Sequence, residues 1–351
     1  MVKRAERMSG LGDLVPSGWQ VVLQRVMEQP IEMDYLKIDD PRTEKMKRKI
    51  EISFREFSPD EIKLNFPLAT EEFGEYRPVA EKAESPKQLS HFTLGSKIVY
   101  NVKKIAWYSD KVFQECCKHL EINEPPEELI KLFRWAFTHV IRRHMLFHYK
   151  VERGSRLLPE DRYWEYRIKI YQSKEAATRG VLEEALADAY ALTYFEDDLK
   201  TIQSPASIPV ARESIISGFR KMIRAAFLSD SRPPGYKMAK HFLLEFENLK
   251  DTDTIEAIQN LLLYSAMLKG TTNIDGIFRG LSWLYKELTF VEPTSLEKMP
   301  LPPAPPYPSK NFLLFVENFR KDATFFLLLL LPPTEEAFID TAFSPRRLPV
   351  K

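Results

Sequence analysis

The chain has 351 residues, 44% of them apolar and 29% charged, which is enough for a sizeable core in one or two domains. Its 51 basic and 50 acidic side chains leave a net charge of +1, so charge gives no reason to expect a nucleic acid as partner. The longest apolar run, seven residues at 325–331, is far shorter than the roughly 20 residues that a membrane span needs.

Two further features indicate a cytoplasmic protein. Residues 1–16 form a charged arm without the apolar segment of a secretory signal. Cys116 and Cys117 are adjacent, and neighbouring cysteines seldom satisfy disulfide geometry. We therefore expect reduced thiols, which are typical of the cytoplasm.

The first part of the chain predicts one short helix and two strands. Residues 18–27 fit a helix that turns Trp19, Val22, Leu23 and Val26 inward. Apolar residues alternate with charged ones at 50–54 and again at 62–66, which predicts two half-buried strands joined by a turn at 58–60. The polar, proline-containing stretch 70–90 indicates a loop.

The next segment predicts a strand followed by a helix. Ile98, Tyr100 and Val102 alternate with polar residues, as in a strand or the edge of a hairpin. Asp110 is a suitable N-cap for a helix that ends near His119.

A long helix is the most prominent element of the middle of the chain. Pro125 and Pro126 precede it, and Glu127 and Glu128 lie in its first turn, where the helix dipole favours acidic groups. It should continue to about residue 153 and stop at the glycine that follows. Its apolar residues occupy several faces, which is typical of a buried central helix.

The remainder predicts mostly helices and then a proline-rich linker. The helical patterns cover 159–171, 178–194, 209–228, 236–249, 253–268 and 273–288. Prolines dominate 299–308, and the apolar stretches 311–319 and 323–331 fit strands or a helix equally well.

The predicted fold class is α+β, mainly helical with a small β-sheet on its N-terminal side. We divide the chain into an N-terminal α/β region, a helical domain, a linker and a detached tail, at 1–94, 95–290, 291–310 and 311–351.

Four side chains in the helical domain predict a metal site. His144 and His148 are four residues apart, so they lie on the same face of the long helix. Glu184 and Asp188 have the same spacing on a later helix. Two imidazoles and one carboxylate suit Zn²⁺, and a second carboxylate can orient a ligating histidine through its other ring nitrogen.

This pattern resembles the gluzincin branch of zincin metallopeptidases, in which His-Glu-x-x-His on one helix is followed by Glu-x-x-x-Asp on another. The resemblance extends over about residues 95–200, where a strand precedes the helix as it does beside the substrate cleft of that fold. It implies Zn²⁺ bound by His144, His148 and Glu184, with Asp188 behind a histidine. It also implies a peptide or protein as substrate or partner.

One position departs from the family pattern. Met145 stands where the family has the glutamate that acts as general base, and a thioether cannot accept a proton. General acid–base catalysis is typically worth about 10²–10⁴-fold, so peptide hydrolysis should be weak or lost, as in a pseudoenzyme. Glu152 and Glu183 are the nearest carboxylates in sequence, but neither has a suitable position on an ideal helix.

Other interpretations of the same residues remain open. His144 and His148 can be buried histidines bonded to carboxylates with no metal, in a non-catalytic helical scaffold that binds a partner. His139 is out of register with them and should be structural. Arg142 and Arg143 should form a solvated edge, or one of them can bind a substrate carboxylate.

Overall fold

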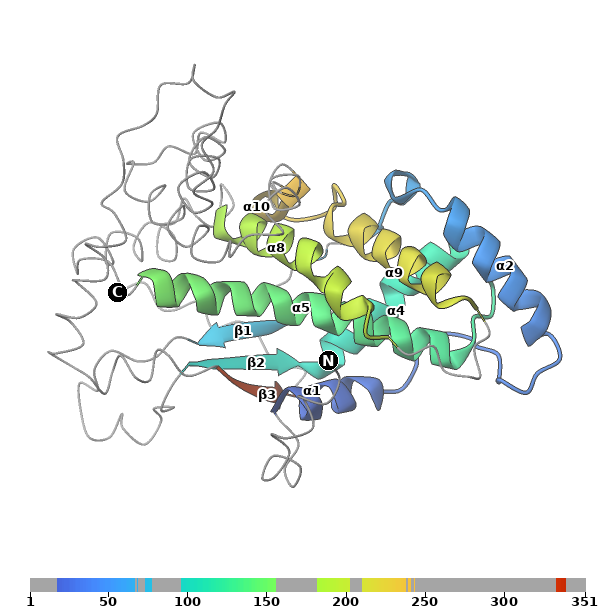
Figure 1. Cartoon of the computed structure of the whole chain (residues 1–351), viewed down its shortest axis with the longest axis horizontal. Helices are drawn as coiled ribbons and strands as arrows, with labels where there is room; N and C mark the ends of the chain where they lie inside the picture. Colours follow the sequence, from blue (N-terminus) through green and yellow to red (C-terminus); the bar gives the residue numbers. More distant parts are fainter. Residues whose placement is uncertain are drawn as a thin grey trace, which may run out of the picture.

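The computed structural model describes residues 18–66, 68, 73–77, 96–155, 182–202, 210–237, 239–240, 243 and 333–338. Helix α5 (Glu127–Ser155) runs through the middle of this part of the chain (Figure 1). Helices α8 (Leu182–Leu199) and α9 (Arg212–Phe227) lie along one side of it, and a small sheet lies on the other. The predicted α+β class with a small sheet is confirmed.

Helix α5 is the long buried helix that the sequence predicts. It begins directly after Pro126 and ends at Ser155, close to the expected end. Its apolar side chains face helices on several sides, and Leu129, Phe133, Phe137 and Ile141 are fully buried. An apolar surface this wide needs cover from more than one direction, which explains the central position of the helix.

The sheet contains strands β1 (Gly74–Arg77), β2 (Lys97–Asn101) and β3 (Thr334–Phe338), in the order β1-β2-β3. Strands β1 and β2 are antiparallel, whereas β2 and β3 are parallel. The predicted strand near residue 98 is therefore confirmed, but it is the central strand of this sheet. Strand β1 lies within the segment 70–90 that we expected to be a loop.

Strand β3 comes from the region that we expected to be a detached tail. Glu335 accepts two hydrogen bonds from the Arg142 guanidinium, at 2.8 and 3.0 Å to the same oxygen, and one from the Tyr100 hydroxyl at 2.8 Å. Helix α1 (Gly18–Met27) packs so closely beside it that a Cβ on Gly18 would overlap the Glu335 carbonyl. Residues 334–338 are thus part of the fold, and Arg142 is an internal anchor rather than a solvated edge.

The two predicted strands around residues 50–54 and 62–66 are wrong. Residues 50–54 lie in helix α2 (Thr43–Glu56), in which Ile50 and Phe54 are fully buried while Ile52 is 37% exposed. That spacing of four is helical, and the alternation of period two is coincidental. The turn at 58–60 is present as a short 3₁₀ helix, η2 (Pro59–Glu61), and residues 62–66 form no strand.

Helix α4 (Val102–His119) ends where predicted, but its N-cap lies nine residues earlier than expected. Asn101, the last residue of β2, caps it by accepting a hydrogen bond from the Lys104 backbone N–H at 3.1 Å. Asp110, the expected cap, is instead buried inside the helix and paired with Arg134.

Some of the other predicted helices are present, and several predicted elements lie in parts of the chain that the structure does not describe. Helix α1 matches its expected range, and α8 and α9 overlap theirs. Helix α10 (Pro234–Lys237) covers the start of the pattern at 236–249. The expected elements at 159–171, 253–268, 273–288, 299–308, 311–319 and 323–331 lie outside the described residues. Within those residues, no helix is long and apolar enough to cross a membrane.

Candidate metal centre

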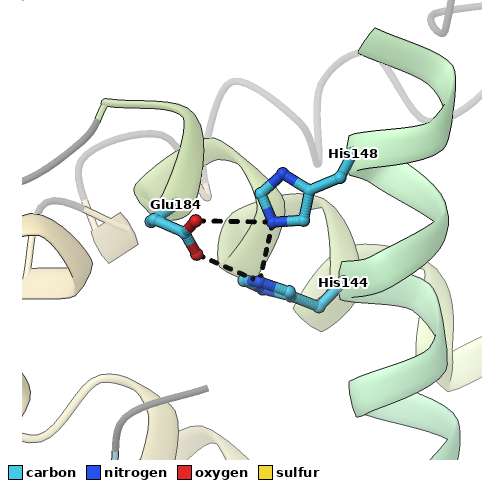
Figure 2. A group of neighbouring side chains, drawn as sticks. All are labelled: His144, His148 and Glu184. Carbon is cyan, nitrogen blue, oxygen red and sulfur yellow. Dashed lines mark hydrogen bonds and ion pairs between the residues drawn. The ribbon is translucent and has the colours of Figure 1, made fainter. Parts of the chain in front are cut away.

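Helices α5 and α8 bring three potential ligands together. His144 and His148 project from adjacent turns of α5, and Glu184 faces them from the first turn of α8 (Figure 2). The two histidine Nε2 atoms are 3.0 Å apart. Oε2 of Glu184 lies 3.1 Å from Nε2 of His144, and Oε1 of Glu184 lies 3.5 Å from Nε2 of His148.

These distances fit a tetrahedral metal ion. Two ligand atoms about 2.0–2.1 Å from an ion and at the tetrahedral angle lie about 3.3 Å apart. The two Nε2 atoms are 3.0 Å apart, and the contacts of Glu184, made through a different carboxylate oxygen to each histidine, are 3.1 and 3.5 Å long, on both sides of this value. With one ligand atom from each residue, all within 4.8 Å of one another, the group could hold a metal ion.

Small side chains on α8 explain how the two helices approach so closely. Ala185, Ala187, Ala189 and Ala191 are all fully buried. A larger residue at such positions would push α8 away from α5 and separate the carboxylate from the imidazoles. The alanines of α8 therefore permit the close packing of the two helices.

Asp188 orients one of the histidines. Its Oδ1 atom lies 2.7 Å from Nδ1 of His144, and both side chains are almost completely buried. A carboxylate at this distance favours the tautomer with hydrogen on Nδ1, which leaves the lone pair of Nε2 directed toward Glu184 and His148. Asp188 thus contacts the His144 ring at the nitrogen that faces away from Glu184 and His148, and its role behind a metal ligand stays a prediction.

The charge of Glu184 is stabilised by the same group. Burial raises the pKa of the Glu184 carboxyl, but the two adjacent histidines lower it more, so the net pKa is well below its usual value. The side chain remains 24% exposed. Glu184 is therefore an ionised carboxylate, partly open to solvent, that could act as a ligand.

Met145 follows His144 on α5, and its side chain reaches strand β1. It is 3% exposed and packs near strand β1, where a Cβ on Gly74 would lie 3.4 Å from its terminal methyl group. It fills the space between α5 and the sheet with apolar atoms. The side chains of Glu152 and Glu183 lie outside the described residues, so the structure does not test them as substitutes.

Arg143 and His139, two other polar residues of α5 considered above, both lie beside Asp198. Arg143 donates two hydrogen bonds to Asp198, at 2.7 and 2.9 Å, and Nδ1 of His139 lies 3.3 Å from the same carboxylate. The His139 ring also packs 4.1 Å from that of Trp135. His139 is structural as expected, whereas Arg143 is an ion-pair partner rather than a solvated residue.

Sequence reasoning missed Arg232. Its guanidinium is buried and donates hydrogen bonds to Oδ2 of Asp188 and to the backbone carbonyl of Leu68. The residue lies in the polar turn 229–233 between α9 and α10, where an arginine normally indicates an exposed surface. No local pattern in the sequence marks it as part of the centre.

No family model, curated protein sequence or solved structure matches this chain. The geometry of the described residues therefore carries the functional argument alone.

Proposed function

We propose that the chain is a zinc-binding protein of gluzincin-like metallopeptidase ancestry, with peptide hydrolysis weak or lost. The observation that carries this proposal is the convergence of His144, His148 and Glu184, which each offer one ligand atom within 4.8 Å of the others. Asp188 supplies the supporting contact that ligating histidines commonly have.

The donor set favours zinc among common ions. Two imidazole nitrogens and one carboxylate oxygen match the ligands of catalytic zinc sites, whereas Ca²⁺ and Mg²⁺ prefer oxygen ligands alone. When bound in such a site, zinc acts as a Lewis acid and lowers the pKa of a coordinated water to about 7. His144, His148 and Glu184 would hold it.

The position of the sheet also supports the proposed ancestry. Strand β1 is an edge strand of the described sheet, runs antiparallel to β2 and lies beside α5 near Met145. The zincin fold commonly has a strand lining the substrate cleft beside this helix. In that fold such a strand pairs with an extended peptide, which makes a peptide or protein the proposed ligand class.

The buried free thiols Cys116 and Cys117 support a reducing compartment, and we propose the cytoplasm. Burial raises the pKa of both thiols, so they are poor nucleophiles and play no part in the proposed chemistry.

Metal content tests the binding part of the proposal. Protein purified without chelator should contain about one equivalent of zinc, and His144→Ala should remove it because it eliminates a ligand. His119→Ala is the matched control, since His119 is 39% exposed at the end of α4 and should leave zinc unchanged. A zinc content well below one equivalent that does not respond to His144→Ala would refute the proposal.

Substitution of Met145 tests the ancestry. Met145→Glu returns a proton acceptor to the helix and should raise peptidase activity by about 10²–10⁴-fold if the base is the missing component. Met145→Gln has nearly the same shape but cannot accept a proton, so it should remain inactive. Equal inactivity of both zinc-loaded variants would show that the cleft no longer performs hydrolysis.

A metal-free interaction scaffold is the alternative, and one observation favours it. The ring nitrogens of His144 and His148 are within hydrogen-bonding distance of each other, and both lie close to Glu184. Protons alone can therefore satisfy this group. A zinc-free protein that binds its partner equally well with and without His144→Ala would support the scaffold.

A further inference from the structure

Arg232 occupies a position that a cation seldom takes. Its side chain is fully buried, and its guanidinium lies 4.2 Å from the ring centre of Tyr236 and 5.1 Å from that of Phe227. Removing an arginine from water is costly unless its N–H groups find acceptors in the interior. The acceptors of Arg232 therefore indicate why it is there.

Through those acceptors, Arg232 connects its own segment to two others. One is Oδ2 of Asp188 on α8, and another is the carbonyl of Leu68, which precedes strand β1 in sequence. Arg232 itself lies between α9 and α10. The planar guanidinium holds its N–H groups in a fixed fork, so these contacts determine where the Asp188 carboxylate lies.

The two oxygens of Asp188 have different partners. Oδ2 accepts from Arg232, and Oδ1 faces Nδ1 of His144 at 2.7 Å. A carboxylate held at one oxygen cannot rotate freely, so its other oxygen stays aligned with the imidazole. The chain Arg232–Asp188–His144 is continuous and buried, and it ends at a ligand of the candidate metal centre.

We propose that Arg232 is a positioning residue, which orients His144 for metal binding by fixing the Asp188 carboxylate. Its effect on metal affinity rests on the proposed zinc site. Its effect on the tautomer of His144 does not, because the contacts from Arg232 to His144 need no metal.

A double-mutant cycle on zinc affinity separates positioning from general stabilisation. Loss of a group that supports a metal ligand typically weakens metal binding by about 10–100-fold, and we expect this for both Arg232→Gln and Asp188→Asn in the full-length protein. If Arg232 acts through Asp188, the double variant should bind zinc no more weakly than Asp188→Asn alone. Losses that multiply in the double variant would overturn the proposal.

Two further variants sharpen the zinc measurement. Arg224→Gln removes a partly buried arginine that pairs with Glu196 at 3.0 Å and not with the metal centre, so it should leave zinc affinity unchanged. Arg232→Lys keeps the charge but lacks the fork, so it should still weaken zinc binding by about tenfold. A lysine variant that equals the wild type would show that charge alone suffices and would refute the positioning role. This comparison also serves if Arg232→Gln fails to fold.

The metal-free protein provides an independent test. ¹⁵N NMR of ring-labelled histidine should show His144 with hydrogen on Nδ1 in the wild type and a mixture of tautomers in Arg232→Lys. An identical tautomer in both would overturn the inference. If the wild type binds no zinc, the proposed function fails, and the NMR result still decides the role of Arg232.

Discussion

Helix α5 carries two buried polar clusters that differ in what they leave available. The arginine cluster consists of Arg134, Asp110 and the backbone carbonyls of residues 26, 29 and 30. The histidine cluster consists of His144, His148 and Glu184. Arg134 and His144 are separated by ten residues, or about 15 Å along the helix.

The arginine cluster is closed. Arg134 directs five hydrogen bonds to the interior, two of them to Asp110 and three to main-chain carbonyls. Five is the number of N–H groups that a guanidinium has. Asp110 also accepts the backbone N–H of Glu32 at 3.1 Å. This cluster fastens the segment after α1 to α4 and α5.

The histidine cluster, by contrast, is rich in hydrogen-bond acceptors. Its converging atoms are two imidazole nitrogens and two carboxylate oxygens, all of which can act as acceptors. Such a group needs protons or a cation between its members. The comparison shows that the arginine cluster is matched in donors and acceptors, whereas the histidine cluster leaves room for protons or a cation.

Breaking the arginine cluster should have the largest effect on stability. Asp110→Ala leaves the buried Arg134 guanidinium without its carboxylate, which should lower the free energy of unfolding by about 3–5 kcal/mol. Denaturant unfolding measures this loss. The zinc content of the folded fraction should not change, and a coupled loss of zinc would mean that the two clusters are not independent.

The polar group between the clusters should give a smaller, pH-dependent effect. Burial raises the pKa of the Asp198 carboxyl, but Arg143 and His139 lower it more, to about 2. A folded pKa below the unfolded value of about 3.9 stabilises the protein above pH 4, and the benefit disappears as the pH falls toward 2.

Asp198→Asn should therefore cost about 2–3 kcal/mol at neutral pH, and its difference from the wild type should shrink steadily below pH 4. Urea unfolding at several pH values measures this difference. A cost that is the same at pH 3 and pH 7 would contradict the proposed charge stabilisation.

The C-terminal strand should give the smallest effect. Glu335→Gln weakens the contacts with Arg142 and Tyr100 and should cost about 1–3 kcal/mol, since these are hydrogen bonds to a charged group. The neighbouring Glu336 is 53% exposed, and its pair with Lys97 should contribute less than about 1 kcal/mol. Glu336→Gln is thus the matched control. Equal losses would mean that the Glu335 contacts do not anchor β3.

Local spacing was sufficient to predict the histidine cluster. The i, i+4 pairs His144–His148 and Glu184–Asp188 depend only on helix geometry, and the long apolar helix is evident from its composition. The close approach of α5 and α8 could be anticipated from the alanines of α8. These features are predictable because each is encoded within one helix.

The features that sequence could not predict depend on distant partners. Strand β3 is defined by its pairing with β2, more than 230 residues earlier in the chain, and the buried role of Arg232 depends on Asp188 and Leu68. Residues 50–54 were misassigned because a short amphipathic helix can imitate alternation when Ile52 is exposed by chance.

Anomalous diffraction at the zinc absorption edge, from crystals grown with zinc, tests the central claim most directly. The account predicts one strong peak about 2.0–2.2 Å from Nε2 of His144, Nε2 of His148 and a carboxylate oxygen of Glu184. A zinc peak located elsewhere, or no peak between these three side chains in zinc-saturated crystals, would contradict it.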